Sequence, residues 1–184
     1  IARKMGTFSW EELSALEIGA LLHDIGKIGI PDTILRKPGP LTPEEYHIIR
    51  QHPIMGYEIL SDIPQFSPAL PIVRSHHERG DGSGYPDGLV AHQIHPLVKM
   101  VSIADVFDAL TSPRYYRGPF SPEEALKTLA KEVRQGWWDP TYFEIFHDLF
   151  LSGELDLIYR MARPNMTLSP TSSTAPPITQ KRTA

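Results

Sequence analysis

Several histidines in this sequence lie beside a carboxylate or beside another histidine, and one aspartate lies within the apolar stretch SIADVFDAL. Imidazole and carboxylate donors together suit iron, manganese or zinc, and more than four donors can hold two ions that share a bridging oxygen. Two divalent ions a few ångströms apart suit phosphodiester cleavage, because they generate hydroxide at neutral pH, neutralise the phosphate and orient an in-line attack. The candidate metal ligands are His23, Asp24, His52, His76, His77 and Asp105.

Each candidate also has an ordinary structural interpretation. The pair His23-Asp24, taken alone, fits a helix-end histidine with its hydrogen-bond partner about as well as it fits a metal site. Asp105 is more informative, because a carboxylate buried among apolar residues is costly unless a cation compensates it. Asp108, one helical turn later, fits either an acceptor that supports a ligand or a surface charge. The other histidines are interpreted as surface or capping residues: His47, His92, His95 and His147.

The elements that must position these donors are predicted to be helices. Apolar residues at helical spacing over 13–21 lead to His23 and Asp24, after which glycines interrupt the pattern. A helix therefore delivers this pair at its C-terminal end. Residues 1–5 followed by Gly6 resemble the last turn of a helix. Helix starts with an N-capping residue are expected at Ser9, Thr42, Ser121 and, more weakly, Asp139.

Apolar stretches over 97–111 and 141–151 predict two further helices, and no alternating strand pattern is present, so the expected fold is an all-α bundle. Residues 78–88 (ERGDGSGYPDG) hold four glycines and a proline, which predicts a loop near the site. One domain is expected over 1–162. Residues 163–184 are rich in Pro, Ser and Thr, which predicts a disordered tail.

The composition of the chain excludes several classes of ligand and site. The 184 residues are 41% hydrophobic and 22% charged, as expected for one globular domain. A formal net charge of −4 argues against duplex nucleic acid as a ligand and favours a small anion bound by local cations or metals. The absence of cysteine excludes disulfides and thiolate metal sites, and no apolar run reaches the roughly 20 residues of a membrane span. A cytoplasmic protein is the expectation.

Two motifs carry a family resemblance. LLHDIGKIGIPD (21–32) resembles the HD superfamily of metal-dependent phosphohydrolases, and HHERGDGSGYPDGL (76–89) is similar to its HD-GYP branch. KPGPLTPEEY (37–46), QHPIMG (51–56) and IADVFDALTSPRYYR (103–117) match the same pattern in order. The resemblance covers residues 15–140. It implies an HD-type helical bundle with a glycine-rich active-site loop, and metal-dependent hydrolysis of cyclic di-GMP to linear pGpG or, by a second cleavage, to GMP.

The resemblance also assigns roles to individual residues. The six donors named above correspond to ligands of two or more divalent metal ions, with iron or manganese expected, and Asp24 and Lys27 would act in catalysis. Lys27 matches a lysine near the scissile phosphate, although a solvated helix-end cation is the alternative. Tyr85 would stack on a guanine. Arg114 and Arg117 would meet the phosphates, unless they form surface ion pairs.

The sequence departs from the family pattern in two places. Gly80 follows Arg79 where the family often has a bulky residue, which is expected to loosen the loop. The family's first helix carries a further histidine, and this chain is expected to lack that helix, so that metal binding would be incomplete or the N-terminus rearranged. An upstream regulatory domain and protein contacts through the GYP loop are expected partners. The alternatives to a cyclic di-GMP phosphodiesterase are an HD phosphohydrolase acting on another nucleotide, and a non-catalytic sensing or protein-interaction module.

Overall fold

The computed structural model describes residues 1–113 and 118–155, and it confirms the predicted all-α fold. Within these residues no strand forms, and a single isolated bridge joins Asp81 to Val90 across the glycine-rich loop. The elements are α1 (Ala2–Met5), α2 (Trp10–Leu22), the 3₁₀ helix η1 (Ile25–Gly29), α3 (Asp32–Leu35), α4 (Pro43–Ile49), α5 (His52–Ser61), the 3₁₀ helix η2 (Pro64–Ala69), α6 (Leu70–Ser75), α7 (Pro96–Thr111), α8 (Pro122–Arg134) and α9 (Pro140–Leu151).

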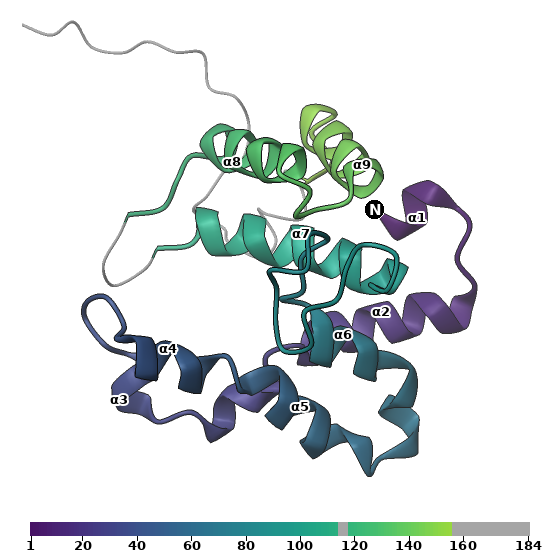
Figure 1. Ribbon diagram of the computed structural model, residues 1–184. Coiled ribbons are helices and arrows are strands. Elements are labelled where there is room, and N and C mark those ends of the chain that lie inside the picture. The colour runs from purple at the N-terminus through teal and green to yellow at the C-terminus, as the bar shows by residue number, and fades with distance from the viewer. Residues whose placement is uncertain (114–117, 156–184) are drawn as a thin grey trace, which may run out of the picture.

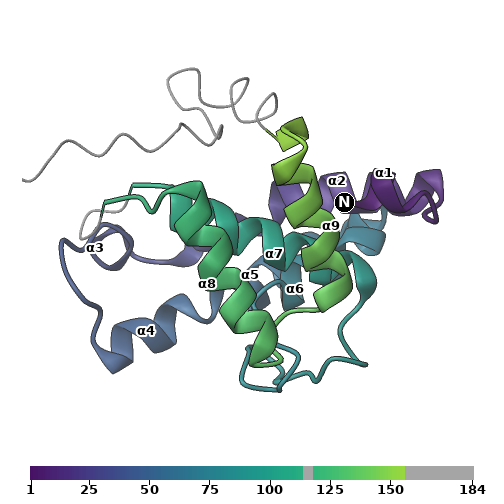
Figure 2. The same ribbon diagram turned by 90° about the horizontal axis from the view of Figure 1, so that it is seen from above.

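Helix α7 runs through the middle of the molecule and separates two groups of helices (Figure 1). Helices α8 and α9 pack on one side of it, and α2 and α6 pack on the other, with α5 against α6 and η1. Helices α3 and α4 project at one end of the bundle, as the view from above also shows (Figure 2). None of the helices in the described residues is long and apolar enough to cross a membrane.

The predicted helix starts are confirmed by their capping hydrogen bonds. Ser9, Thr42 and Ser121 each accept a hydrogen bond from the backbone of a glutamate three residues later, and that glutamate's carboxylate accepts one from the capping residue. Asp139 accepts a hydrogen bond from the backbone of Thr141 (3.0 Å) and begins α9. Gly6 ends α1 in the left-handed conformation (φ 66°), as predicted.

The core supplies a fixed frame for the donor residues. Phe107 of α7 packs edge-on against Phe146 of α9, with ring centres 5.0 Å apart. On the other face of α7, the buried Ser102 hydroxyl donates to the carbonyl of His76 (2.7 Å) and so joins α7 to the end of α6. The predicted domain end at residue 162 and the predicted tail over 163–184 lie outside the described residues.

A close backbone crossing brings the end of α2 against the start of α5. Gly26 in η1 faces Gly56 in α5, and a Cβ atom on Gly26 would lie 1.9 Å from the carbonyl oxygen of His52. Only a residue without a side chain allows this approach. The crossing places Asp24, which immediately precedes η1, beside His52 at the start of α5.

Candidate metal centre

The sequence-predicted donors come together from four helices. Asp24, His52, His76 and His77 each offer one ligand atom, and these atoms all lie within 4.8 Å of one another. His23 Nε2 lies 3.4 Å from Asp24 Oδ2 and 3.6 Å from Asp105 Oδ1, so the remaining two donors adjoin the same group. The end of α2, the start of α5, the end of α6 and the middle of α7 therefore contribute to one cluster, which we call the His/Asp cluster: His23, Asp24, His52, His76, His77 and Asp105.

Backbone carbonyls orient three of the imidazoles. The Nδ1 atoms lie within hydrogen-bond distance of carbonyl oxygens: 2.8 Å from Ala20 for His23, 2.7 Å from Ile49 for His52, and 3.0 Å from Val73 for His76. Because a carbonyl only accepts, each Nδ1 must carry the proton. In the neutral imidazole, Nε2 is then left with a lone pair directed into the cluster, which is the orientation that metal-binding histidines adopt.

The residues present fit a cation. His52 Nε2 and His76 Nε2 lie only 3.2 Å apart, and both are lone-pair atoms in the tautomer that the carbonyls select. Asp24 Oδ1 lies 3.3 Å from His52 Nε2 and 3.8 Å from His76 Nε2, and it is a buried oxygen without a hydrogen-bond partner among the described residues. Electron-rich atoms that face one another in a buried site repel, and a metal ion removes that repulsion.

The protonation states favour metal binding at most positions. Burial, together with the neighbouring His23 and His52, lowers the pKa of His76 to about 4. Burial and His76 lower the pKa of His77 to about 2. Both imidazoles are therefore neutral near pH 7. Burial raises the pKa of Asp24, but contacts with His23 and Lys27 outweigh it and hold that pKa well below its ordinary value.

His23 and Asp105 form the other end of the cluster. Burial alone would lower the pKa of His23, but Asp105 and Asp24 raise it to about 10. Burial raises the pKa of Asp105, and the contact with His23 reverses this and lowers it. Asp105 thus has a cationic partner, which offsets the cost of a carboxylate among apolar residues. Asp108 is exposed and accepts a hydrogen bond from Ser112 (3.2 Å). His23, Asp105 and Asp108 all line a cavity of about 430 Å³.

The family model of the HD domain matches residues 1–142, most of the chain. The chain belongs to the HD domain family. A cyclic di-GMP phosphodiesterase of Thermotoga maritima is 42% identical over 169 residues, which are 91% of this chain and 45% of that protein. The cyclic di-GMP phosphodiesterase response regulator RpfG of Xanthomonas campestris is 46% identical over 70% of this chain and 34% of its own length. A 3'3'-cGAMP-specific phosphodiesterase of Vibrio cholerae is 39% identical over 79% of this chain and 33% of its own length.

A solved structure with the same fold supports the HD-GYP resemblance. Bd1817, described as an HDG"Y"P protein from Bdellovibrio bacteriovorus, matches with a TM-score of 0.66 and 28% identity over 80% of this chain and 47% of that chain. The chain spans less than half the length of the curated relatives named above. The family and the HD-GYP type are therefore those that the sequence motifs indicated.

The GYP loop of this HD domain approaches the His/Asp cluster through Tyr85. Its ring stacks on the imidazole of His77, with ring centres 4.8 Å apart. Lys27 contacts the cluster from η1, with Nζ 2.5 Å from Asp24 Oδ2. Arg114 and Arg117, predicted to meet phosphates, lie outside the described residues.

A buried carboxylate that the sequence analysis missed anchors this loop. Glu78, only 1% exposed, accepts hydrogen bonds from the backbone of Asp87 (2.7 Å), Gly88 (3.1 Å) and Leu89 (2.9 Å). Arg74 of α6 then holds the Asp87 carboxylate with two hydrogen bonds of 2.8 Å. An acidic residue at the start of a long glycine-rich segment is the signal that could have predicted this anchor, because such a segment presents many unpaired N–H groups.

Gly80, where the sequence predicts a looser loop, makes close backbone contacts in the structure. Gly80 donates to the carbonyl of Trp137 (2.9 Å) and accepts from the N–H of Ala91 (3.0 Å). A Cβ atom at this position would lie 2.6 Å from the carbonyl oxygen of Gly136, so glycine permits a close backbone contact with the α8–α9 connection. The neighbouring Arg79 places its guanidinium 3.6 Å from the ring centre of Trp137. Glycine at this position therefore permits a contact that a bulky side chain would displace.

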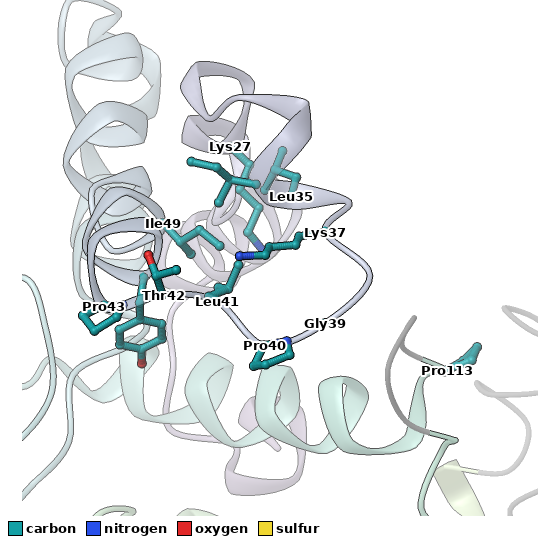
Figure 3. A pocket seen from close by; sticks show the side chains of 12 residues that line it. Lys27, Leu35, Lys37, Gly39, Pro40, Leu41, Thr42, Pro43, Ile49 and Pro113 are labelled. Atoms are coloured by element: carbon teal, nitrogen blue, oxygen red, sulfur yellow. The ribbon is translucent and has the colours of Figure 1, made fainter.

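A cavity of about 1210 Å³ lies beside Lys27 in this HD domain. The segment from α3 to α4 forms most of its wall, and Pro113, after α7, lies across from that wall (Figure 3). Tyr46 of α4 also lines the cavity, and it leads to Arg50, whose guanidinium carbon lies 5.9 Å from the Tyr46 ring centre and 4.6 Å from the Tyr85 ring centre. Neither Tyr46 nor Arg50 was predicted from the sequence as a site residue.

Proposed function

We propose that this chain hydrolyses the phosphodiester bonds of cyclic di-GMP, giving linear pGpG or, by a second cleavage, GMP. The observation that carries the proposal is the convergence of Asp24, His52, His76 and His77 on a space small enough for shared metal ions, beside a cavity large enough for a nucleotide. Two relatives that match this chain over most of its length are named as cyclic di-GMP phosphodiesterases. Such a second-messenger activity would place the protein in the bacterial cytoplasm.

The His/Asp cluster would hold two or more divalent ions, with iron or manganese as the best matches to a set of imidazoles and carboxylates. His52, His76 and His77 would supply imidazole nitrogen atoms, and Asp24 would supply its carboxylate, whose buried Oδ1 has no hydrogen-bond partner among the described residues. His23 and Asp105 extend the donor set toward α7. Bound divalent ions supply the Lewis acidity that activates water and neutralises phosphate charge.

The remaining residues would act on the substrate. Lys27 lines the cavity while its ammonium contacts Asp24, so it is placed to donate to an oxygen of a phosphate held at the cluster. Tyr85, fixed against His77, would present its ring edge and hydroxyl to a guanine. Because His77 and Arg50 both contact the Tyr85 ring, a guanine could stack on that ring only at a face that neither of them covers. Arg114 and Arg117 remain predicted phosphate-binding residues.

A second candidate substrate is 3'3'-cGAMP. A relative that is 39% identical over 79% of this chain is named as specific for that dinucleotide. The two substrates share both phosphodiesters and one guanine, so the His/Asp cluster serves either equally well. We further propose an upstream regulatory domain and protein contacts through the loop that contains Gly84-Tyr85-Pro86. The alternative to an enzyme is a sensing or protein-interaction module without turnover. Measurement of metal content together with turnover distinguishes that module from an enzyme.

The test combines elemental analysis with turnover. The purified protein, loaded with iron or manganese, should hold at least two metal equivalents and cleave cyclic di-GMP, and its kcat/KM for 3'3'-cGAMP decides between the two candidate substrates. An Asp24→Ala variant should lose both metal and turnover, while His92→Gln, a change at an exposed histidine away from the cluster, should keep both. A fully metallated protein that binds the dinucleotide without cleaving it would instead be a sensor.

A further inference from the structure

Among the residues that the structure describes, three cations lie near the cavity or between it and the His/Asp cluster: Lys27, Lys37 and Arg50. Lys27 is paired with Asp24 (2.5 Å), and Lys37 is paired with Glu45 (2.6 Å). Arg50 differs, because among the residues that the structure describes no carboxylate lies within ion-pair distance of its guanidinium. A half-buried cation without an anion beside a proposed phosphate-cleaving site is placed to receive an anionic ligand.

Arg50 stands between the cavity and the metal ligands. It caps the C-terminus of α4, one turn after Tyr46 and two residues before His52. Its guanidinium carbon lies 4.6 Å from the ring centre of Tyr85, which in turn stacks on His77 at 4.8 Å. Tyr46, Arg50, Tyr85 and His77 thus form a continuous strip from the wall of the cavity to the cluster.

The contacts with the two tyrosines leave the hydrogen-bonding capacity of Arg50 unused. A guanidinium attracted to an aromatic face still has N–H donors that can reach oxygen atoms, and no hydrogen-bond acceptor for Arg50 occurs among the described residues. The rings fix the position of the charge, and the planar donors match the paired oxygens of a phosphate. The arrangement therefore leaves a fixed guanidinium with donors available to an anionic ligand.

We propose that Arg50 binds the second, uncleaved phosphate of a cyclic dinucleotide, and that the cavity of about 1210 Å³ receives the nucleoside next to that phosphate. This inference rests on the proposed function, which puts the scissile phosphate at the His/Asp cluster. A cyclic dinucleotide always carries a second phosphate within the same ring. Lys27 is engaged with Asp24 at the cluster, so Arg50 is the nearby cation in the described residues that is placed for this second charge. The predicted phosphate-binding residues Arg114 and Arg117 lie outside the described residues.

The test uses the metal-loaded protein, two substrates and three variants. Cyclic di-GMP has two phosphates, whereas bis(p-nitrophenyl) phosphate has one phosphodiester and nothing for Arg50 to bind. Arg50→Gln removes the charge, and Arg50→Lys keeps it without the planar fork. Arg36→Gln is the matched control, because Arg36 lies on the same end of the bundle, with a side chain that is 72% exposed and pairs only loosely with Asp32 (3.8 Å).

Arg50→Gln should weaken the binding of cyclic di-GMP by at least about tenfold, the effect of one lost charge-assisted contact. It should lower kcat/KM for cyclic di-GMP about tenfold more than for bis(p-nitrophenyl) phosphate, mainly through KM. Arg50→Lys should recover part of the affinity. Arg36→Gln should match the unmodified protein with both substrates, and the metal content of every variant should be unchanged.

Equal losses on both substrates would overturn the proposal, since Arg50 would then act by holding Tyr85 and the cluster. Unchanged affinity for cyclic di-GMP in Arg50→Gln would also overturn it. If the unmodified protein binds cyclic di-GMP without cleaving it, the proposed hydrolysis fails, and the Kd values alone still decide the role of Arg50. If it neither binds nor cleaves the dinucleotide, both proposals are wrong.

Discussion

The carboxylate of Glu78 accepts a hydrogen bond from the backbone N–H of Leu89 (2.9 Å), so the two ends of the glycine-rich loop are tied together across eleven residues. The same carboxylate accepts from Asp87 and Gly88 (2.7 and 3.1 Å). Three N–H donors on one buried anion make a rigid base for the segment that carries Tyr85. The position of Tyr85 against His77 therefore depends on Glu78 as well.

Replacing this anion should loosen the loop without removing any candidate ligand. Glu78→Gln keeps the shape but loses the charge and turns an amide N–H₂ group toward N–H donors, which leaves buried donors unsatisfied. The free energy of unfolding should fall by about 2 kcal/mol. Urea denaturation measures this, with Glu58→Gln, a change at an exposed glutamate, as the control that should stay within about 0.5 kcal/mol. A loss no larger than the control's would show that the three bonds contribute little.

Gly26 should be intolerant of even one methyl group. In Gly26→Ala the new Cβ atom would lie 1.9 Å from the carbonyl oxygen of His52 and 2.5 Å from the backbone nitrogen of Gly56. Both neighbours are backbone atoms, so η1 and α5 must move apart, which costs about 1 to 3 kcal/mol and separates Asp24 from His52. Thermal denaturation and metal titration should both show the loss. Gly118→Ala is the control, because a Cβ atom on Gly118 would meet no atom of the described residues within 4 Å. Normal metal affinity in Gly26→Ala would count against the crossing as the element that positions Asp24.

The helix ends and the donor set were predictable because they depend on local chemistry. A capping residue such as Thr42 and its glutamate lie three positions apart in any helix, so the sequence contains the whole interaction. The donors could be proposed because few environments other than a metal site suit so many imidazoles and carboxylates. Their convergence, however, depends on the crossing of η1 and α5 and on the packing of α6 against α7, which the sequence pattern does not encode.

The residues that were missed act through contacts between distant segments. In the sequence, Arg50 is an ordinary cation at a helix end. Its candidate role depends on its contact with Tyr85, which lies 35 positions later in the sequence and is brought close by the fold. Gly80 was interpreted as a weak point because its partner, the backbone of Gly136 and Trp137, lies more than fifty residues away. Local patterns cannot distinguish a glycine that gives freedom from one that permits close contact.

Gly80 gives a test of that distinction. Gly80→Trp restores a bulky residue after Arg79, as the family pattern would favour, yet we expect it to destabilise the protein. The side chain would displace the α8–α9 connection, because even a Cβ atom on residue 80 would lie 2.6 Å from the carbonyl oxygen of Gly136. The midpoint of thermal unfolding should fall by several degrees, and the N–H groups of Gly80 and Ala91 should exchange faster with deuterium. An unchanged midpoint would mean that the loop and the connection separate at little cost.

Metal removal should destabilise the whole bundle, because the His/Asp cluster joins α2, α5, α6 and α7. An ion that binds only the folded protein adds stability in proportion to the logarithm of its concentration over Kd, about 2.7 kcal/mol at a hundredfold excess over Kd. Manganese should therefore raise the unfolding midpoint and a chelator should lower it. In Asp24→Asn the oxygen that faces His52 and His76 loses its charge, so the response to manganese should largely disappear. His92→Gln should respond like the unmodified protein, and a full manganese response in Asp24→Asn would place the ion away from the cluster.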